Sequence, residues 1–138
     1  MRLTDHTDYA LRVLMHLGAN GDRLATTGEV AFLHGISHNH LTKVVHQLGR
    51  AGFVETVRGR AGGIRLARQP AEIMVGAVVR ATGPDFHVVA CLDAASPPCA
   101  LAPSCVLRGA LCRATECFLQ ALDRVPLAAL LPPPQVPA

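Results

Sequence analysis

Residues 35–66 read GISHNHLTKVVHQLGRAGFVETVRGRAGGIRL, and this stretch carries the strongest structural signal in the chain. Its first half predicts a helix, because Ser37 can cap the start and Ala51-Gly52 can close the end. Apolar residues recur inside this helix at steps of three and four, which predicts a narrow buried stripe of Leu41, Val44, Val45 and Leu48.

The residues before this helix predict a second helix across a tight turn. Thr26 and Glu29 have the spacing of a capping box, so a short helix is expected over 27–34. Gly35 follows at a position that favours a left-handed residue. Helix, glycine turn and helix form the helix-turn-helix arrangement. A further helix is expected over 4–19, with an apolar stripe of Ala10, Leu11, Leu14 and Leu17.

The residues after residue 52 predict a β-hairpin with a basic tip. Residues 53–57 are largely β-branched or aromatic, residues 58–63 are glycine and arginine with one alanine, and residues 64–66 form the returning strand. A wing that lies along DNA needs this composition, because glycine lets the backbone approach closely and arginine neutralises phosphate. The expected fold class is therefore mostly α with a small β-hairpin wing, which is a winged helix-turn-helix domain.

The outward face of the helix after Ser37 carries short or basic hydrogen-bonding groups and no acid. Asparagine and threonine can bind base edges, and lysine can reach a phosphate or a guanine. An ordinary exposed polar face is the alternative interpretation. The predicted DNA-contacting residues on the helix and the hairpin are Ser37, His38, Asn39, His40, Thr42, Lys43, His46, Arg58, Arg60, Gly62 and Arg65.

Charge is unevenly distributed along this chain of 138 residues, whose formal net charge is +3. The first 70 residues carry nine Lys or Arg against five Asp or Glu, whereas the rest carries four against five. The basic excess is concentrated in residues 43–68, where Glu55 is the one acid. Both a solvated basic face and a phosphate-binding surface fit this pattern.

The second half of the chain predicts a short helix, a long loop and a long helix. The short helix is expected over 76–81, before Gly83-Pro84. Residues 84–104 form an irregular, proline-bearing segment, and a loop of this length is usually functional or disordered. From about 104 to 125, apolar residues alternate steps of four and three, as in a heptad seam, at Leu107, Leu111, Ala114, Phe118, Ala121 and Val125.

We expect the long helix to pair with a second copy of the chain, because helix-turn-helix proteins usually span two half-sites. Packing on the core of its own domain is the alternative. The expected organisation is a DNA-binding domain at 1–83, a cysteine loop at 84–105, a dimerisation helix and C-terminal segment at 106–131, and a disordered tail at 132–138.

The five cysteines are not expected to form a disulfide framework. No secretory signal or membrane span is recognisable, which favours a reducing, cytoplasmic setting. Three thiolates on a flexible loop, at Cys91, Cys99 and Cys105, could hold an iron–sulfur cluster, zinc or copper(I), or could stay free of metal. Cys112 and Cys117 lie on the predicted long helix, where Cys117 is expected to pack beside the apolar seam.

The sequence lacks several common catalytic and nucleotide-binding motifs. It contains no H-E-x-x-H, no G-x-S-x-G and no G-x-x-x-x-G-K-[ST] pattern. We therefore predict a DNA-binding protein that is not an enzyme.

Several stretches resemble the iron–sulfur repressor family that includes NsrR, IscR and RirA. The resemblance extends to about residue 131, and Asn39-His40 and Val79-Arg80 place it nearest to the NsrR-type repressors, which sense nitric oxide. It is carried by residues 1–12, 35–45, 48–53 and 57–66, by the three-cysteine loop, and by residues 118–119, 122–123 and 127–131.

The resemblance implies a repressor that binds an operator as a homodimer and responds to nitric oxide through an iron–sulfur cluster. Cys91, Cys99 and Cys105 would hold a [4Fe-4S] cluster, with [2Fe-2S] as the alternative, and Asp8 of the partner subunit would supply a fourth ligand. The other candidates for that ligand are His87, His6, Asp5, a water molecule or a small thiol.

Two positions bear on how far the resemblance extends. Arg108 stands where IscR-type proteins have a histidine three residues after the last cluster cysteine, and the gap between Cys91 and Cys99 is longer than the family usually has. The alternative functions are an iron-responsive or thiol-redox regulator of the same fold and a zinc-bound structural winged-helix protein.

Overall fold

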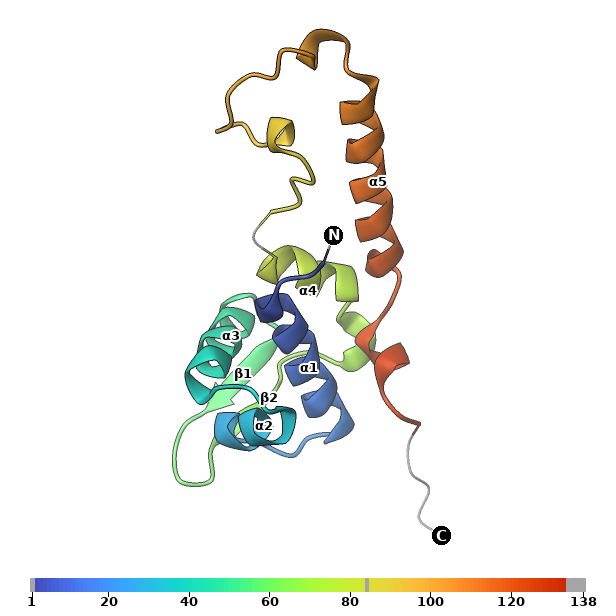
Figure 1. Ribbon diagram of the computed structural model, residues 1–138. Helices are drawn as coiled ribbons and strands as arrows, with labels where there is room; N and C mark the ends of the chain where they lie inside the picture. The colour runs from blue at the N-terminus through green and yellow to red at the C-terminus, as the bar shows by residue number, and fades with distance from the viewer. Residues whose placement is uncertain (1, 84, 134–138) are drawn as a thin grey trace.

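The structure, a computed structural model, describes residues 2–83 and 85–133. A winged domain forms the lower part of the molecule in Figure 1, and a long helix with the loop before it projects upward. The elements in chain order are α1 (Asp5–Ala19), α2 (Thr27–His34), α3 (His38–Arg50), β1 (Val54–Val57), β2 (Gly63–Leu66), η1 (Pro70–Glu72), α4 (Val75–Thr82), η2 (Ala90–Leu92), η3 (Ala102–Ser104), α5 (Val106–Asp123) and η4 (Leu127–Leu130). The predicted winged helix-turn-helix fold is confirmed.

The first three helices begin at the capping residues that the sequence predicts. The side-chain oxygens of Thr4, Thr26 and Ser37 accept hydrogen bonds from backbone N–H groups three residues later, at 3.2, 3.0 and 3.1 Å. Gly35 ends α2 in the left-handed region at φ +63°, where a side chain would be strained. Local chemistry therefore sets the boundaries of the helix-turn-helix.

The wing is a two-stranded antiparallel hairpin in which Val54 pairs with Leu66 and Val57 with Gly63. Each strand differs by one residue from the predicted range, because the first begins at Val54 and the second begins at Gly63. Ala25 extends the hairpin by exchanging two backbone hydrogen bonds with Ile64, at 3.0 and 2.7 Å. These bonds join the wing to the segment that precedes α2.

The main core confirms the predicted stripe of α3. Leu41, Val44 and Leu48 are fully buried, and Val45 is nearly so. They pack in one cluster with buried side chains of α1, α2, the hairpin and the C-terminal segment. Burial of these apolar side chains is the main favourable contribution to folding, and conformational entropy largely offsets it.

The long helix is attached to the winged domain by its C-terminal half. Val75 and Val79 of α4 pack against Leu119 of α5 in a second apolar cluster. Arg80 forms two hydrogen bonds with the Asp123 carboxylate, the shorter of them 2.6 Å, and this bonding raises the pKa of the Arg80 guanidinium. The chain then returns to the main core, where Leu127 is buried and its N–H donates to the Ile73 carbonyl at 2.7 Å.

The predicted heptad seam is only partly buried within one chain. Phe118 and Val125 are half-buried, whereas Leu107, Ala114 and Ala121 are exposed. The buried residue of α5 is Leu119, which lies outside the predicted seam. The expectation that Cys117 packs beside the seam is wrong for the single chain, because its side chain is exposed.

The second half otherwise follows the sequence prediction with shifted boundaries. The short helix α4 runs one residue further at each end than expected, and α5 is two residues shorter at each end. Of the predicted tail at 132–138, residues 134–138 lie outside the described residues. In the part of the chain that the structure describes, no helix is long and apolar enough to cross a membrane.

Replacing Gly76 by Ala should weaken the junction between α4 and α5. A Cβ atom at Gly76 would lie 1.9 Å from Asp123 Oδ1 and 2.6 Å from the Asp123 backbone nitrogen, so α5 would have to move. We expect a loss of about 1–3 kcal/mol in the free energy of unfolding, measured by urea denaturation. Gly109→Ala is the matched control, because its Cβ would meet only the flexible end of Arg113 at 3.4 Å. Equal stability of the two variants would contradict the close packing.

Candidate functional site: the DNA-facing surface and the cysteine loop

One exposed face of α3 collects most of the predicted base-reading residues. His38, Asn39, Thr42, Lys43 and His46 are all exposed. Their spacing along the helix is that of a single face, because side chains three to four positions apart lie one above another. The Thr42 hydroxyl donates to the His38 carbonyl at 2.8 Å, which leaves its oxygen free to accept.

Ser37 and His40 occupy different positions from the other predicted contacts. The Ser37 hydroxyl is used as the helix cap, where it accepts the His40 N–H. The His40 ring is half-buried against Tyr9, with ring centroids 4.9 Å apart in an edge-on arrangement, and it lies 6.1 Å from the His6 ring. The structure therefore turns His40 toward α1, and DNA contact by these two residues stays a prediction.

The wing lies beside α3, as Figure 1 shows, and its sequence carries several arginines. Arg58 and Arg60 are exposed at the tip. Arg65 forms an ion pair with Glu55 on the neighbouring strand, so part of its charge is neutralised within the hairpin. A Cβ atom at Gly62 would lie 2.1 Å from the Val57 carbonyl oxygen, which explains a glycine at this point of the turn.

Arg68 is a further basic residue at the base of the wing, outside the set of DNA-contacting residues predicted from the sequence. Its guanidinium lies over the Phe53 ring, 5.2 Å from the ring centroid. A cation over an aromatic face is attracted to the ring, which fixes the direction of the arginine. The sequence gives little indication of the contact between Arg68 and Phe53, because two residues fifteen positions apart form no periodic pattern.

The three loop cysteines lie on a segment with little packing. Cys91 is half-buried in the turn Ala90–Leu92, Cys99 is exposed, and Cys105 is half-buried at the start of α5. All three are free of disulfides. None of residues 85–105 is fully buried. Few core contacts would therefore have to break for the three thiols to approach one another.

The donor chemistry of this loop fits a metal group that prefers sulfur. Thiolates are the ligands of iron–sulfur clusters and of soft metal ions. Across the described residues, no three His, Cys, Asp or Glu side chains are grouped closely enough to hold a metal ion. A cluster at Cys91, Cys99 and Cys105 would thus require the loop to fold around it, as metal binding often does.

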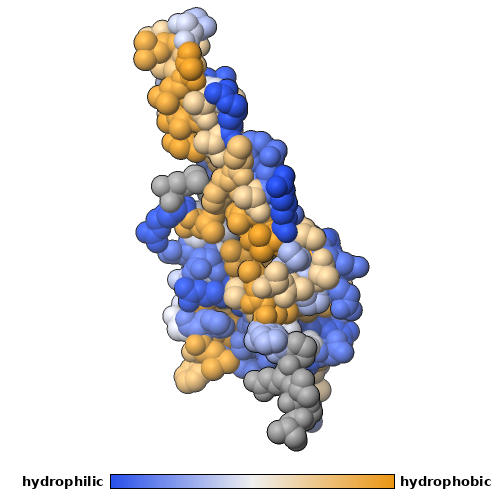
Figure 2. Space-filling view, turned by 90° about the vertical axis from the view of Figure 1, so that its right-hand side faces the viewer, coloured by the Kyte–Doolittle hydropathy of each residue, from blue (hydrophilic) through white to orange (hydrophobic). Residues whose placement is uncertain are grey.

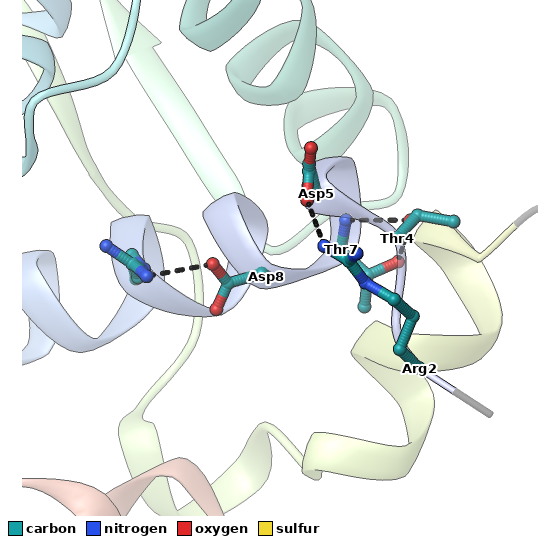
Figure 3. A network of polar contacts seen from close by, with 6 residues as sticks. Arg2, Thr4, Asp5, Thr7 and Asp8 are labelled. Carbon is teal, nitrogen blue, oxygen red and sulfur yellow. Dashed lines mark hydrogen bonds and ion pairs between the residues drawn. The ribbon is translucent and has the colours of Figure 1, made fainter.

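Asp8 lies on the first turns of α1, away from the cysteines in sequence. Its carboxylate is about half exposed and forms an ion pair with Arg12 one turn later, at 3.0 Å (Figure 3). Asp5 pairs instead with Arg2 at 3.3 Å. Both carboxylates stabilise the start of the helix, where negative charge is favoured by the helix dipole.

The two histidines considered as ligands differ in their surroundings. His6 is hydrogen-bonded through its ring Nε2 to the Gln47 side chain. His87 is exposed near the start of the loop, 3.9 Å from the Asp85 carboxylate. A third histidine, His34, packs on His16, and desolvation together with His16 and Arg12 lowers its pKa.

A helix-turn-helix with an exposed polar recognition helix, followed by a basic wing, defines a winged-helix DNA-binding protein. Residues 3–133 match the model of the Rrf2 family, which is described as an iron-dependent transcriptional regulator. This chain belongs to the Rrf2 family. It is a transcriptional regulator and not an enzyme, as the sequence predicts.

Curated relatives support the same assignment in more detail. The HTH-type transcriptional regulator NsrR of Geobacillus kaustophilus is 50% identical over 132 residues, which are 95% of this chain and 90% of that protein. NsrR of Bacillus subtilis is 45% identical over the same share of both chains. The predicted resemblance to NsrR-type regulators is confirmed, and proteins of this family commonly bind iron–sulfur clusters.

Solved structures share the fold at low sequence identity. CymR, the global cysteine regulator of B. subtilis, superimposes with a TM-score of 0.75 at 23% identity, covering 94% of this chain and 95% of that one. IscR of T. potens gives a TM-score of 0.74 at 23% identity, covering 94% and 85%. At this identity the likeness concerns the fold alone.

Replacing Arg60 and Asn39 separately by Ala should affect DNA binding in two different ways. Arg60→Ala should weaken binding to every duplex and reduce the slope of log affinity against log salt by about one, because it removes one phosphate contact. Asn39→Ala should relax sequence preference instead, by about 1–3 kcal/mol at one base position. Fluorescence anisotropy with duplexes selected from a random pool measures both quantities.

The charge-matched control for this comparison is Arg113→Ala, an exposed arginine on α5. It should leave the salt slope and the sequence preference as they are in the parent. If both Arg60→Ala and Asn39→Ala also bound like the parent across the salt titration, the DNA-facing surface would lie elsewhere.

Proposed function

We propose that this chain is a repressor whose binding to operator DNA is controlled by an iron–sulfur cluster that senses nitric oxide. The observation that carries the proposal is the set of three unpaired thiols, Cys91, Cys99 and Cys105, on a loop without a buried residue. The 50% identity to a regulator named NsrR, in a family that commonly binds iron–sulfur clusters, supports a cluster as the group that this loop binds. The proposed cluster is [4Fe-4S], with [2Fe-2S] as the alternative.

The proposed working form is a homodimer joined through α5. The free end of this helix and the turn before it expose large apolar side chains, with Leu101 70%, Val106 81% and Leu107 62% exposed. Figure 2 shows apolar surface gathered over the projecting part of the molecule. Pairing of two copies would cover this surface and would present two α3 helices to two half-sites of one operator.

In this proposal the three cysteines hold the iron–sulfur cluster, and Asp8 of the partner subunit stays bound only while the cluster is intact. When bound, the cluster supplies iron that reacts with nitric oxide. A carboxylate is a hard donor among soft thiolates, so Asp8 of the partner subunit would be the weakest of the four contacts. Once released, Asp8 can pair with Arg12 of its own helix, as it does in this structure. Asp8 would thereby connect the winged domain of one subunit to the cysteine loop of the other.

Removing any one loop cysteine should abolish the colour of the protein. We expect Cys91→Ala, Cys99→Ala and Cys105→Ala each to lose the visible absorption of anaerobically purified protein, because three thiolates leave no spare ligand. Cys112→Ala and Cys117→Ala are the matched controls, since both thiols are exposed on α5, and they should keep it. Full absorption in any of the first three variants would contradict the ligand assignment. A colourless parent would instead favour a thiol-redox or zinc-bound regulator.

Replacing Asp8 by Ala should keep a cluster but change its environment. We expect altered visible circular dichroism and a less steep loss of DNA binding as nitric oxide is added, because one link between the subunits is gone. Asp5→Ala is the matched control, a carboxylate less than one turn away that pairs with Arg2. Spectra and titrations identical to those of the parent would remove Asp8 from the coordination sphere, and a change in Asp5→Ala alone would assign Asp5 instead.

A further inference from the structure

Gln47 is a half-buried amide on α3 that the DNA-facing surface does not use. Its Nε2 donates a hydrogen bond of 2.6 Å to the Ala81 carbonyl in the last turn of α4. Its Oε1 is hydrogen-bonded to the ring Nε2 of His6 in the first turn of α1. One side chain of the recognition helix therefore bonds to the two helices that support it.

The orientation of the Gln47 amide follows from its partners. The Ala81 carbonyl can only accept, so the NH₂ end of the amide must face it. The Oε1 end is then left to accept, and His6 must carry a hydrogen on Nε2 in order to donate. Turning the amide over would place its oxygen against a carbonyl oxygen, which makes the observed direction the only one that satisfies both contacts.

A third polar contact closes the arrangement between the two supporting helices. The hydroxyl groups of Thr7 on α1 and Thr82 on α4 are both buried and share a hydrogen bond of 3.2 Å. Three contacts thus link α1, α3 and α4 in pairs: His6 with Gln47, Gln47 with Ala81, and Thr82 with Thr7. We refer to these five residues as the polar triangle.

The polar triangle lies at the junction of the two functional regions. His6 and Thr7 immediately precede Asp8, and Ala81 and Thr82 are the last residues of α4 before the segment that leads to the cysteines. A cavity of about 520 Å³ adjoins this end, with Thr7, Gly83 and Phe86 among the residues that line it. Because a cavity rather than close packing adjoins the polar triangle, its hydrogen bonds are the directional contacts between the helices at this end.

We propose that Gln47 is a positioning residue, which fixes how the recognition helix sits against α1 and α4. Through the polar triangle, a displacement of the turn that carries Asp8 or of the root of the cysteine loop reaches α3. The apolar stripe of α3 resists separation but is tolerant of small rotations, whereas a hydrogen bond is directional. The inference rests on the proposed function for cluster control, but the positioning of α3 does not require a cluster.

The test uses variants that change one bond at a time. His6→Phe keeps a ring beside His40 but loses the Nε2 hydrogen, and His6→Gln restores an N–H donor. Gln47→Leu removes both of the amide bonds, and the double variant His6→Phe/Gln47→Leu completes a cycle. Gln120→Ala is the matched control, because Gln120 bonds only to Glu116 on the exposed side of α5.

The measured quantity is the ratio of affinities for a duplex selected from a random pool and for a random-sequence duplex of equal length. It is determined for full-length protein with its cluster and after removal of the iron by a chelator. Melting temperature and circular dichroism are recorded for each variant, because a purely structural role would change these without changing the ratio.

We expect His6→Phe and Gln47→Leu each to lower the ratio about fivefold in the cluster-free protein, in keeping with the loss of a partly buried hydrogen bond. The double variant should lose no more than Gln47→Leu alone, and His6→Gln should recover most of the ratio. For each protein, the affinity ratio with the cluster is compared with the ratio without it. This difference should be smaller in His6→Phe than in the parent. Gln120→Ala should match the parent.

Folded variants that keep the parent ratio would overturn the positioning role, as would strictly additive losses in the double variant. If Gln47→Leu does not fold, the comparison of His6→Phe with His6→Gln decides. If the parent has the same ratio with and without its cluster, the proposed cluster control fails, and Gln47 is still judged on the cluster-free ratios.

Discussion

Leu41, Val44 and Leu48 of α3 are fully buried in the core that α1 also forms, and the position of every DNA-facing group on α3 depends on that burial. Apolar contact is strong but weakly directional, so it holds α3 against its neighbours without defining its rotation to a fraction of a turn. Directional contacts define the rotation of α3. The caps define where the helix begins, and the Gln47 amide ties it to α1 and α4.

The same separation of roles applies to the long helix. Only its C-terminal half contacts the winged domain, through Leu119 and through the ion pair between Arg80 and Asp123, while the other half projects with its apolar side chains exposed. Leu127 then returns to the main core and anchors the segment that follows α5. A helix held at one end leaves its other half free, and in the proposed homodimer this half would contact the second copy of the chain.

The cysteine loop differs physically from the rest of the molecule. The winged domain has a closed core, whereas residues 85–105 contribute no fully buried side chain. A segment with few apolar contacts has little stability of its own and can adopt the path that a bound group imposes. In the proposed function, sensing and DNA binding therefore belong to segments of opposite character, which meet at the end of α4.

Local patterns in the sequence were sufficient for the helix-turn-helix, its caps and the hairpin, because each depends on residues only a few positions apart. The sequence also identified Cys91, Cys99 and Cys105 as thiols on an unpacked loop. Contacts between distant positions required the tertiary structure: Gln47 with His6, Arg80 with Asp123, and the turn of His40 toward Tyr9. Pairs separated by 31 to 43 positions leave no periodic signal in one sequence, and only packing of the helices determines which polar side chains meet.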